Sequence, residues 1–361
     1  MPPAPRATLG TPQVVQTQHR QICVHTRLID EVHEWKIQQS LRMVREMGAT
    51  TIVEFFPWAY IEPSPGNYNW SQVDTIMQHA QNQGIQVIAR LGYVPEWARP
   101  TAEDQSTTLN YLTSENYADF AAFAAKFASR YKNEISQIII WNEPNLSFEW
   151  GFQAVDPAAY ANLLQAVYPV IKEANPDVEI LAGALAPTLE SADSANGMND
   201  IDYLRGMYEA GAGDSFDALA IHTYGFTYPA EATPSSDTLN FRRAELLRAV
   251  MTEFGDEVKP VYITEMGWND HPRWANSVTP AQRAQYTIKA FQWADENWPW
   301  AKTLCVWALR YPAPTYNYPD YFTLLTPAFQ AKPIYYAIQD YAHGDEQETP
   351  LWYPPPIIEE R

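Results

Sequence analysis

Cysteine and positive charge are both scarce in this sequence. Two cysteines, Cys23 and Cys305, are too few for a disulfide framework, and no cysteine and histidine cluster has the spacing of a zinc site. The 24 lysines and arginines are outnumbered by 43 aspartates and glutamates, which gives a net charge of −19. A field of that sign repels phosphate backbones and anionic lipid, so we expect no nucleic-acid partner.

Long hydrophobic runs are missing as well. No stretch approaches the roughly 18 residues of a membrane span, and the first residues lack the apolar core of a signal peptide. We therefore expect no membrane span. The chain is either cytosolic or a secreted protein whose signal has been removed, and we favour the second.

Apolar material for a large core is plentiful. Of 361 residues, 46% are hydrophobic and 14% aromatic, which excludes wholesale disorder. Residues 1–20 are rich in Pro, Thr and Gln, and residues 344–361 are rich in Pro and Glu. We predict a tail or linker stub at each end and one domain over residues 21–343.

Short apolar runs alternate with longer amphipathic stretches throughout that domain, as in βα units around a parallel sheet. An open doubly wound sheet is the structural alternative, but it usually has a glycine-rich turn after its first strand, and none follows residues 22–25 here. We therefore predict an α/β fold, a single-domain (β/α)8 TIM barrel. The eight predicted strands are 22–25, 51–56, 86–91, 137–141, 179–184, 218–222, 260–264 and 303–309.

A glutamate follows two of these runs, where a barrel strand reaches the rim that carries active sites. Glu143 follows the fourth run and Glu265 the seventh. Strands four and seven lie on opposite sides of an eight-stranded ring, so the two carboxylates would face each other over the mouth. An isolated glutamate at a strand end often makes only a surface ion pair, but two carboxylates facing each other can cleave a glycosidic bond.

The sequences around both glutamates resemble the active-site signatures of clan A glycoside hydrolases. Residues 141–145 read Trp-Asn-Glu-Pro-Asn and residues 263–268 read Ile-Thr-Glu-Met-Gly-Trp, while residues 58–70 resemble the segment after strand two of these enzymes. Family 39 is most similar, and family 5 is next. The resemblance implies a retaining glycoside hydrolase of β-linked glycosides or polysaccharides, with Glu143 as general acid/base and Glu265 as nucleophile. It implies no cofactor and no metal.

The same resemblance assigns roles to four more residues. Asn142 would hydrogen-bond the 2-hydroxyl of an oligosaccharide or polysaccharide substrate, and Tyr224 would donate to Glu265 and keep it ionised. His222 would belong to the same site, and Trp307 would form the floor beneath the sugar. A strand-end histidine can equally satisfy a backbone carbonyl, and a tryptophan in an apolar run is usually part of the core.

Other side chains near the strand ends could reach the site. We expect Trp268 and Trp58 to stack on sugar faces, ahead of other tryptophans, and His25 either lines the pocket or is a buried, satisfied side chain. Several further residues are weaker candidates for the rim: Glu54, Glu62, Glu96, Glu149, Trp97, Trp150 and Trp274.

The sequence departs from the clan pattern in two places. Strand two lacks the arginine that supports the nucleophile in many members, so Arg90 or Arg310 would have to supply its charge. Strand three lacks the histidine typical of family 5, which favours family 39. The missing arginine keeps an alternative open, namely a catalytically weak or inactive carbohydrate-binding barrel.

Two rival hydrolase classes find no support. The seven histidines include no His-x-His pair and no His-Glu-x-x-His motif, as a metal-dependent hydrolase would need. A serine hydrolase would need Gly-x-Ser-x-Gly, which does not occur.

Side-chain alternation and burial give two last expectations. Cys23 precedes His25 by two residues and Cys305 precedes Trp307 by two, so both thiols should face the barrel lumen as small buried groups rather than a disulfide. Apolar tryptophans and the charge of Glu265 should keep Glu143 protonated near neutral pH, with Glu265 ionised.

Overall fold

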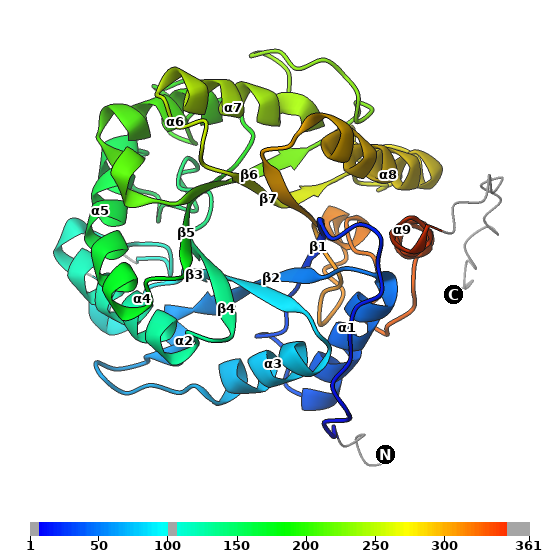
Figure 1. The fold of residues 1–361 in the computed structure, drawn as a ribbon. Helices are drawn as coiled ribbons and strands as arrows, with labels where there is room; N and C mark the ends of the chain where they lie inside the picture. Colours follow the sequence, from blue (N-terminus) through cyan, green and yellow to red (C-terminus); the bar gives the residue numbers. More distant parts are fainter. Residues whose placement is uncertain (1–6, 100–106, 345–361) are drawn as a thin grey trace.

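The strands of this chain close into a parallel barrel. The computed structural model describes residues 7–99 and 107–344, so the predicted C-terminal tail lies outside the described residues beyond Gly344. The strands are paired in chain order, β1 through β8, and β8 pairs with β1 (Figure 1). This confirms the predicted (β/α)8 fold. The strands are β1 Ile22–His25, β2 Thr51–Pro57, β3 Gln86–Gly92, β4 Ile135–Ile140, β5 Glu179–Leu185, β6 Ala218–Tyr224, β7 Val261–Gly267 and β8 Ala301–Val306.

Helices form a ring around the barrel (Figure 1), and their first residues are typical of helix starts. α5 begins with proline after Asp156, whose side chain accepts from the Ala158 amide. α8 has a capping box between Thr279 and Gln282. The helices are α1 Glu34–Met47, α2 Trp58–Ile61, α3 Ser71–Asn82, α4 Tyr117–Arg130, α5 Pro157–Ala174, α6 Asp200–Glu209, α7 Ala244–Glu253, α8 Pro280–Asn297 and α9 Pro333–His343, with short 3-10 turns at Glu96–Ala98, Ser114–Asn116, Ala212–Ser215, Phe241–Arg243 and Tyr318–Tyr321.

Strands four and seven end at different points from those predicted. β4 ends at Ile140, and Trp141 already has a positive φ of 74°. β7 continues to Gly267, so Glu265 lies inside the strand rather than after it. Both glutamates still lie at the carboxyl ends of the barrel strands, where the site was predicted.

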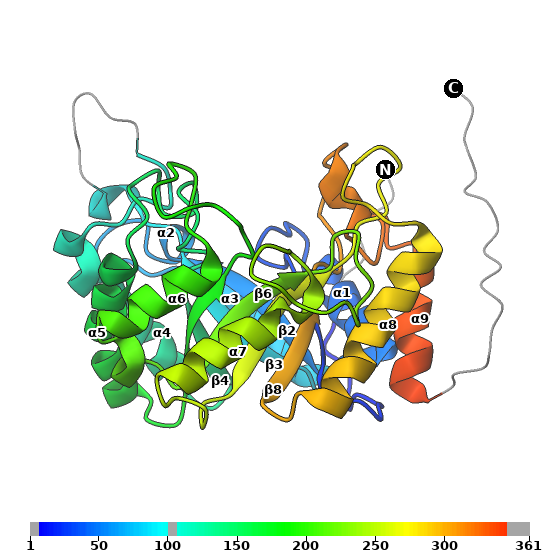
Figure 2. The same ribbon diagram turned by 90° about the horizontal axis from the view of Figure 1, so that it is seen from above.

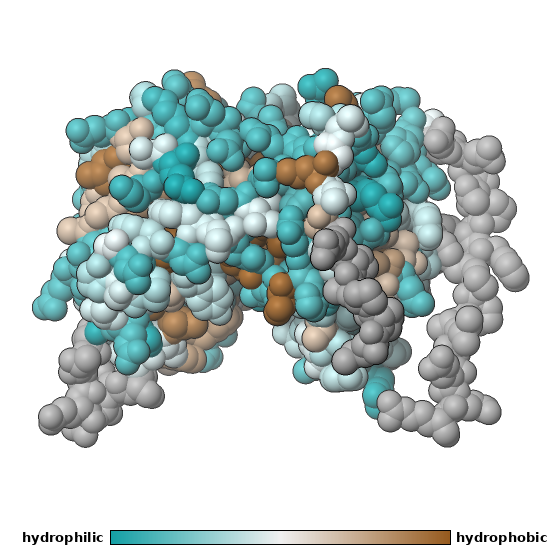
Figure 3. All heavy atoms as spheres, turned by 90° about the horizontal axis from the view of Figure 1, so that it is seen from below, coloured by the Kyte–Doolittle hydropathy of each residue, from teal (hydrophilic) through white to brown (hydrophobic). Residues whose placement is uncertain are grey.

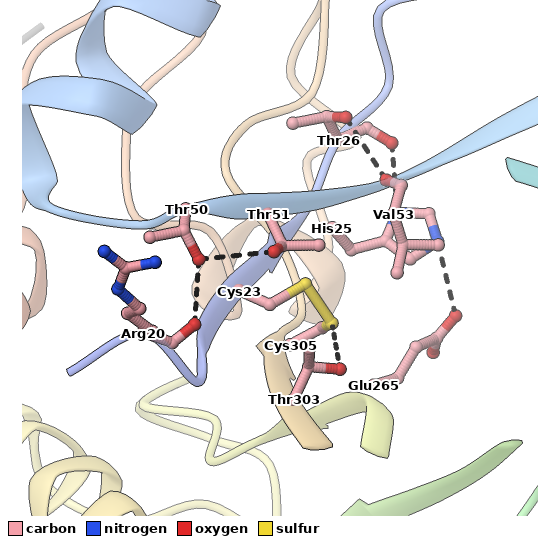
Figure 4. The surroundings of a disulfide bond; sticks show 10 residues. All are labelled: Arg20, Cys23, His25, Thr26, Thr50, Thr51, Val53, Glu265, Thr303 and Cys305. Carbon is pink, nitrogen blue, oxygen red and sulfur yellow. Dashed lines mark hydrogen bonds and ion pairs between the residues drawn. A yellow bond between two sulfur atoms is a disulfide. The ribbon is translucent and has the colours of Figure 1, made fainter. Parts of the chain in front are cut away.

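The barrel lumen holds its own small apolar cluster, which includes Val53, Ile88, Ile139 and the two cysteines. The expectation that Cys23 and Cys305 face the lumen is confirmed, but the expectation of free thiols is wrong. The strand register pairs Cys23 with Cys305 at a Cα–Cα distance of 4.1 Å, and the two form a disulfide (Figure 4). Two thiols directly opposite each other on adjacent strands are within bonding reach.

The predicted N-terminal tail lies against the barrel where the structure describes it. Residues 7–20 contain neither helix nor strand, and the Gln13 amide donates to the Asn82 carbonyl at 2.7 Å. The Gln18 amide donates to the Ala342 carbonyl at 2.7 Å. Among the described helices, none is both long enough and apolar enough to cross a bilayer.

Loops at the carboxyl ends of the strands rise on two sides of the barrel mouth (Figure 2). One side carries the loops that follow β2 to β5, drawn in cyan to green, and the other carries the loops that follow β7 and β8, drawn in yellow to orange (Figure 2). The space-filling view shows the surface hollowed between the two sides (Figure 3). The predicted catalytic glutamates are among the residues that line one cavity at the carboxyl ends of the strands.

Candidate active site

Local backbone geometry directs Glu143 into the barrel mouth. The chain turns sharply after β4, with φ of 74° at Trp141 and 43° at Glu143. The Glu143 amide donates to the Ala184 carbonyl on β5 at 3.1 Å, which ties this turn to the neighbouring strand. Positive φ is uncommon for residues other than glycine, and such positions cluster at functional sites.

Glu265 meets Glu143 across the mouth. One carboxylate oxygen of each lies within 4.8 Å of the other and of a His222 ring nitrogen. Retaining glycosidases hold their two carboxyl groups about 5 to 5.5 Å apart, whereas inverting enzymes need about 6.5 to 9.5 Å to admit a water molecule. The 4.8 Å limit applies to single oxygens of the two carboxylates, and it lies nearer to the retaining spacing than to the inverting one.

His222 and His25 lie beside the two carboxylates. His222 Nδ1 is 2.7 Å from Glu143 Oε1 and 3.5 Å from Glu265 Oε2. Burial lowers the pKa of His222 to about 4, so the ring is neutral at neutral pH. His25 is fully buried with Nε2 3.8 Å from Glu265 Oε1 (Figure 4), and its Nδ1 lies 3.0 Å from the Thr26 carbonyl. His25 is buried and does not line the cavity, as the second expectation had it, but it is only partly satisfied, because Nε2 has no hydrogen-bond partner.

Glu265 has two side-chain hydrogen-bond donors. Arg90 Nη1 donates to Glu265 Oε1 at 3.0 Å, and Tyr224 Oη donates to Oε2 at 2.8 Å. Arg90 Nη1 also donates to Asn142 Oδ1 at 2.6 Å. Arg90 therefore supplies the charge that strand two lacks. The other candidate, Arg310, is wrong, because its guanidinium is held in a buried ion pair with Glu31.

Burial changes the acidity of both glutamates. It raises the pKa of Glu143 to about 7, against the opposing charge of Arg90. Burial also raises the pKa of Glu265 above its ordinary value, while His222, Arg90 and the Tyr224 hydroxyl act in the opposite direction. Repulsion between the two carboxylates raises the pKa of Glu265. The predicted elevation at Glu143 is thus present and burial is its cause, whereas the charge of Glu265, the other predicted cause, does not raise it.

The cavity above the two carboxylates has a volume of about 430 Å³ and is walled mainly by aromatic rings. Trp307 is among its walls, as predicted, and packs edge-on against His25 with ring centroids 4.4 Å apart. The lining comprises Arg27, Phe55, Arg90, Gly92, Tyr93, Asn110, Trp141, Asn142, Glu143, Glu149, Tyr224, Phe226, Glu265, Trp274, Trp307, Tyr311, Tyr318, Pro319 and Phe322.

The two tryptophans expected to stack on sugars do not line this cavity. Trp268 is 1% exposed, and its indole nitrogen donates to the Tyr228 carbonyl at 2.7 Å. Trp58 is fully buried and donates to Glu62 Oε2 at 2.7 Å. Both expectations are wrong, because each ring turns away from the mouth: Trp268 packs on Phe241, and Trp58 packs on rings of α4.

The weaker rim candidates fall into two groups. Glu149 and Trp274 line the cavity, whereas the other five do not. Glu54, for example, is fully buried and accepts from the Thr26 hydroxyl and the Leu28 and Ile29 amides.

Sequence reasoning missed several rings of the cavity wall, one of them, Phe55, in β2 and most of the others in loops. Tyr311, Tyr318 and Phe322 come from the loop after β8, and the Tyr318 ring stacks on Trp274 with centroids 5.2 Å apart. Their only signal in the sequence is the density of tyrosine in that loop.

Glu143, His222 and Glu265 are also the residues with the geometry to hold a metal ion in the described part of the chain. Arg90 already places a positive charge at 3.0 Å from Glu265. A second cation at the same carboxylate would be repelled, so the arrangement fits proton and covalent chemistry better than metal binding.

Comparison with known proteins adds a family and a set of similar folds. The family model for cellulase, glycosyl hydrolase family 5, matches residues 14–308. No curated protein matches the chain. Solved structures similar to this chain include a family 39 glycoside hydrolase from Bacteroides cellulosilyticus WH2, with 21% identity and a TM-score of 0.70. A monomeric β-xylosidase from Caulobacter crescentus CB15 has 20% identity and a TM-score of 0.65.

These likenesses cover most of this chain but less of the known structures. The chain is covered to 92% by the Bacteroides structure and to 91% by the Caulobacter structure, and it spans 65% and 69% of their lengths. At these identities the structures establish the shared fold. The two families suggested by sequence both recur, although the family model that matches is the one placed second.

Proposed function

The chain belongs to glycosyl hydrolase family 5, and from that premise we propose that it cleaves β-linked glycosides or polysaccharides with retention, by a two-glutamate double displacement. The observation that carries the proposal is the approach of Glu143 and Glu265 oxygens to within 4.8 Å of each other. A single anomeric carbon and its glycosidic oxygen fit between carboxylates at this spacing.

The first step forms a glycosyl-enzyme ester. A Glu265 oxygen attacks the anomeric carbon as the bond to the glycosidic oxygen breaks, and Glu143 gives its proton to that oxygen so that the leaving group departs as a neutral alcohol. The second step reverses the chemistry with water. The Glu143 carboxylate takes a proton from the water, the hydroxyl oxygen bonds to the anomeric carbon, and Glu265 is released as a carboxylate.

The surroundings of the two residues support this division of roles. Arg90 and Tyr224 both donate to Glu265, and donors to the ionised form favour a carboxylate ready to attack. Glu143 is instead hydrogen-bonded to the neutral His222 ring, with Nδ1 2.7 Å from Oε1. Burial raises the pKa of Glu143 to about 7, which suits a group that must carry a proton near neutral pH.

The remaining residues bind and orient the sugar in this proposal. Arg90 holds the oxygen of the Asn142 side-chain amide, and one of its two N–H donors serves Glu149, which leaves the other to donate to the 2-hydroxyl as the ring approaches the transition state. Trp307 forms the floor of the site, His222 is hydrogen-bonded to Glu143, and His25 lies 3.8 Å from Glu265. A carbohydrate-binding barrel without turnover is less favoured, because Arg90 replaces the arginine whose loss suggested it.

Hydrolysis of a panel of aryl β-glycosides and β-linked polysaccharides tests the proposal. Wild type should release product whose first-formed anomer retains the β configuration in proton NMR, and Glu265→Gln should lose activity at least ~10³-fold. A 2-deoxy-2-fluoro glycoside should label Glu265, as peptide mass spectrometry would show. Glu96→Gln, an exposed carboxylate outside the cavity, is the control. Oligosaccharide binding without turnover across the panel would favour the binding barrel instead.

A further inference from the structure

Glu149 is a third carboxylate in the cavity that the two-glutamate mechanism does not use. It lies in the same loop after β4 as Glu143, and it lines the cavity together with Asn110 and Asn142. Its carbonyl oxygen accepts from the Trp141 indole nitrogen at 2.8 Å. That contact ties the Glu149 backbone to a buried ring, so the point from which its side chain enters the cavity is fixed.

The Glu149 carboxylate has weak partners. Asn110 Nδ2 donates to Glu149 Oε2 at 3.2 Å, and Asn142 contributes a second side-chain hydrogen bond. Among the ion pairs of the described residues, none includes Glu149, whereas Glu265 is paired with Arg90. Burial, together with the charge of Glu143, raises the pKa of Glu149 to about 7. The ionised form offers about four acceptor sites, so two amide donors leave acceptor capacity unused, and hydroxyl donors from a ligand would favour that form.

The neighbouring groups show which ligand could use that capacity. The cavity is otherwise walled by aromatic rings and by residues already engaged with one another, such as Arg90 with Glu265 and Asn142. Aromatic rings pack against the faces of a sugar, and the hydroxyl groups of Tyr93, Tyr311 and Tyr318 can bond sugar hydroxyls only as neutral partners. Hydroxyl groups that donate to a carboxylate make short, charge-assisted hydrogen bonds.

We propose that Glu149 is a specificity-determining residue that accepts hydrogen bonds from hydroxyl groups of the bound sugar beside Glu143. This inference rests on the proposed function, because it requires a carbohydrate in the cavity. It adds a binding contact that acts on substrate recognition rather than on the bond-breaking step. Loss of Glu149 should therefore weaken binding more than it slows turnover.

The test uses Glu149→Ala and Glu149→Gln in the full chain, with xylobiose or cellobiose as substrate, whichever wild type hydrolyses. Glu149→Ala should lower kcat/KM by about 10- to 100-fold, the effect of one hydrogen bond to a charged group, with most of the change in KM. Glu149→Gln keeps one acceptor oxygen and should lose less. Glu96→Gln removes a carboxylate from an exposed position outside the cavity and should leave KM unchanged. Circular dichroism and thermal melting of each variant separate binding effects from misfolding.

Monodeoxy derivatives of the same disaccharide identify the partner group. If Glu149 accepts a hydrogen bond from one particular hydroxyl, the derivative without that hydroxyl should show almost no fall in kcat/KM between wild type and Glu149→Ala. The comparison is a double-mutant cycle between enzyme and substrate. An equal loss with every derivative, or an unchanged KM for the parent disaccharide in a folded Glu149→Ala protein, would overturn the inference. A wild type that hydrolyses nothing would instead count against the proposed function, so the two failures are distinguishable.

Discussion

Arg90 extends from β3 to the far side of the barrel mouth and places Nη1 3.0 Å from Glu265 Oε1 on β7. The same nitrogen donates to Asn142, so one guanidinium connects the proposed nucleophile to the residue beside the proposed acid. In this protein a strand-three arginine holds a charge that many clan A enzymes place on strand two.

Replacing Arg90 should therefore impair catalysis and shift its pH dependence. Arg90→Ala should lower kcat by about 10²-fold, the cost of removing one preorganised donor from a charged reacting group. The charge of Arg90 lowers the pKa of Glu265, so its removal should raise that pKa and move the acid limb of the pH–rate profile to higher pH. Arg42→Ala, at an exposed position on α1, is the control. An unmoved acid limb would contradict the assigned role.

The alkaline limb should belong to Glu143. Burial raises its pKa to about 7, and the proposed first step requires its protonated form, so kcat/KM should fall as the pH rises through about 7. A 2,4-dinitrophenyl glycoside needs little protonation of its leaving group, so the fall in kcat/KM at alkaline pH should be smaller for that substrate. It should also be smaller in Glu143→Gln. A limb of equal strength with both substrates would argue against Glu143 as the acid.

Replacing Trp307 should mainly reduce activity, whereas replacing Trp268 should mainly reduce stability. Trp307 lines the cavity, so Trp307→Ala should lower kcat/KM with a smaller loss of stability. Trp268 is buried against Phe241 and Tyr286, so Trp268→Ala should cost about 3 to 5 kcal/mol of stability. Thermal melting and steady-state kinetics on both proteins check the contrast.

Gly225 provides a second test of the Trp268 packing. A Cβ at this position would lie 2.0 Å from the Trp268 indole nitrogen, so Gly225→Ala should also destabilise the fold. A Gly225→Ala protein that melts like wild type would show that the ring is free to move.

The disulfide between Cys23 and Cys305 should stabilise the barrel. It closes a loop with a sequence separation of 282 residues, and disulfides restrict the unfolded chain, typically by about 2 to 4 kcal/mol. The double variant Cys23→Ser, Cys305→Ser should melt at lower temperature than wild type while kcat/KM changes little. Intact mass before and after reduction and alkylation in denaturant would establish the bond, and two freely alkylated thiols without reductant would refute it.

The sequence predicted the features that depend on period and strand order. Alternating apolar runs located all eight strands, and the position of Glu143 and Glu265 after runs four and seven placed them across one mouth. Alternation also predicted that both cysteines face the lumen. It could not predict the disulfide, because the register between β1 and β8 depends on closure of the whole barrel.

Features set by loops were harder to predict. Trp58 and Trp268 both follow strand ends, yet each turns into the helix layer, because a large ring is more stable when packed than when exposed. Glu149 and the rings after β8 enter the cavity only through loop conformations that no short-range pattern specifies.

The covalent link between β1 and β8 also determines how this protein would respond to mechanical force. If the chain were pulled from its two ends, the tension would pass through the sulfur–sulfur bond and bypass everything between residues 23 and 305. Both proposed catalytic glutamates lie inside that shielded segment, so stretching would extend the outer segments first while the two carboxylates kept their spacing.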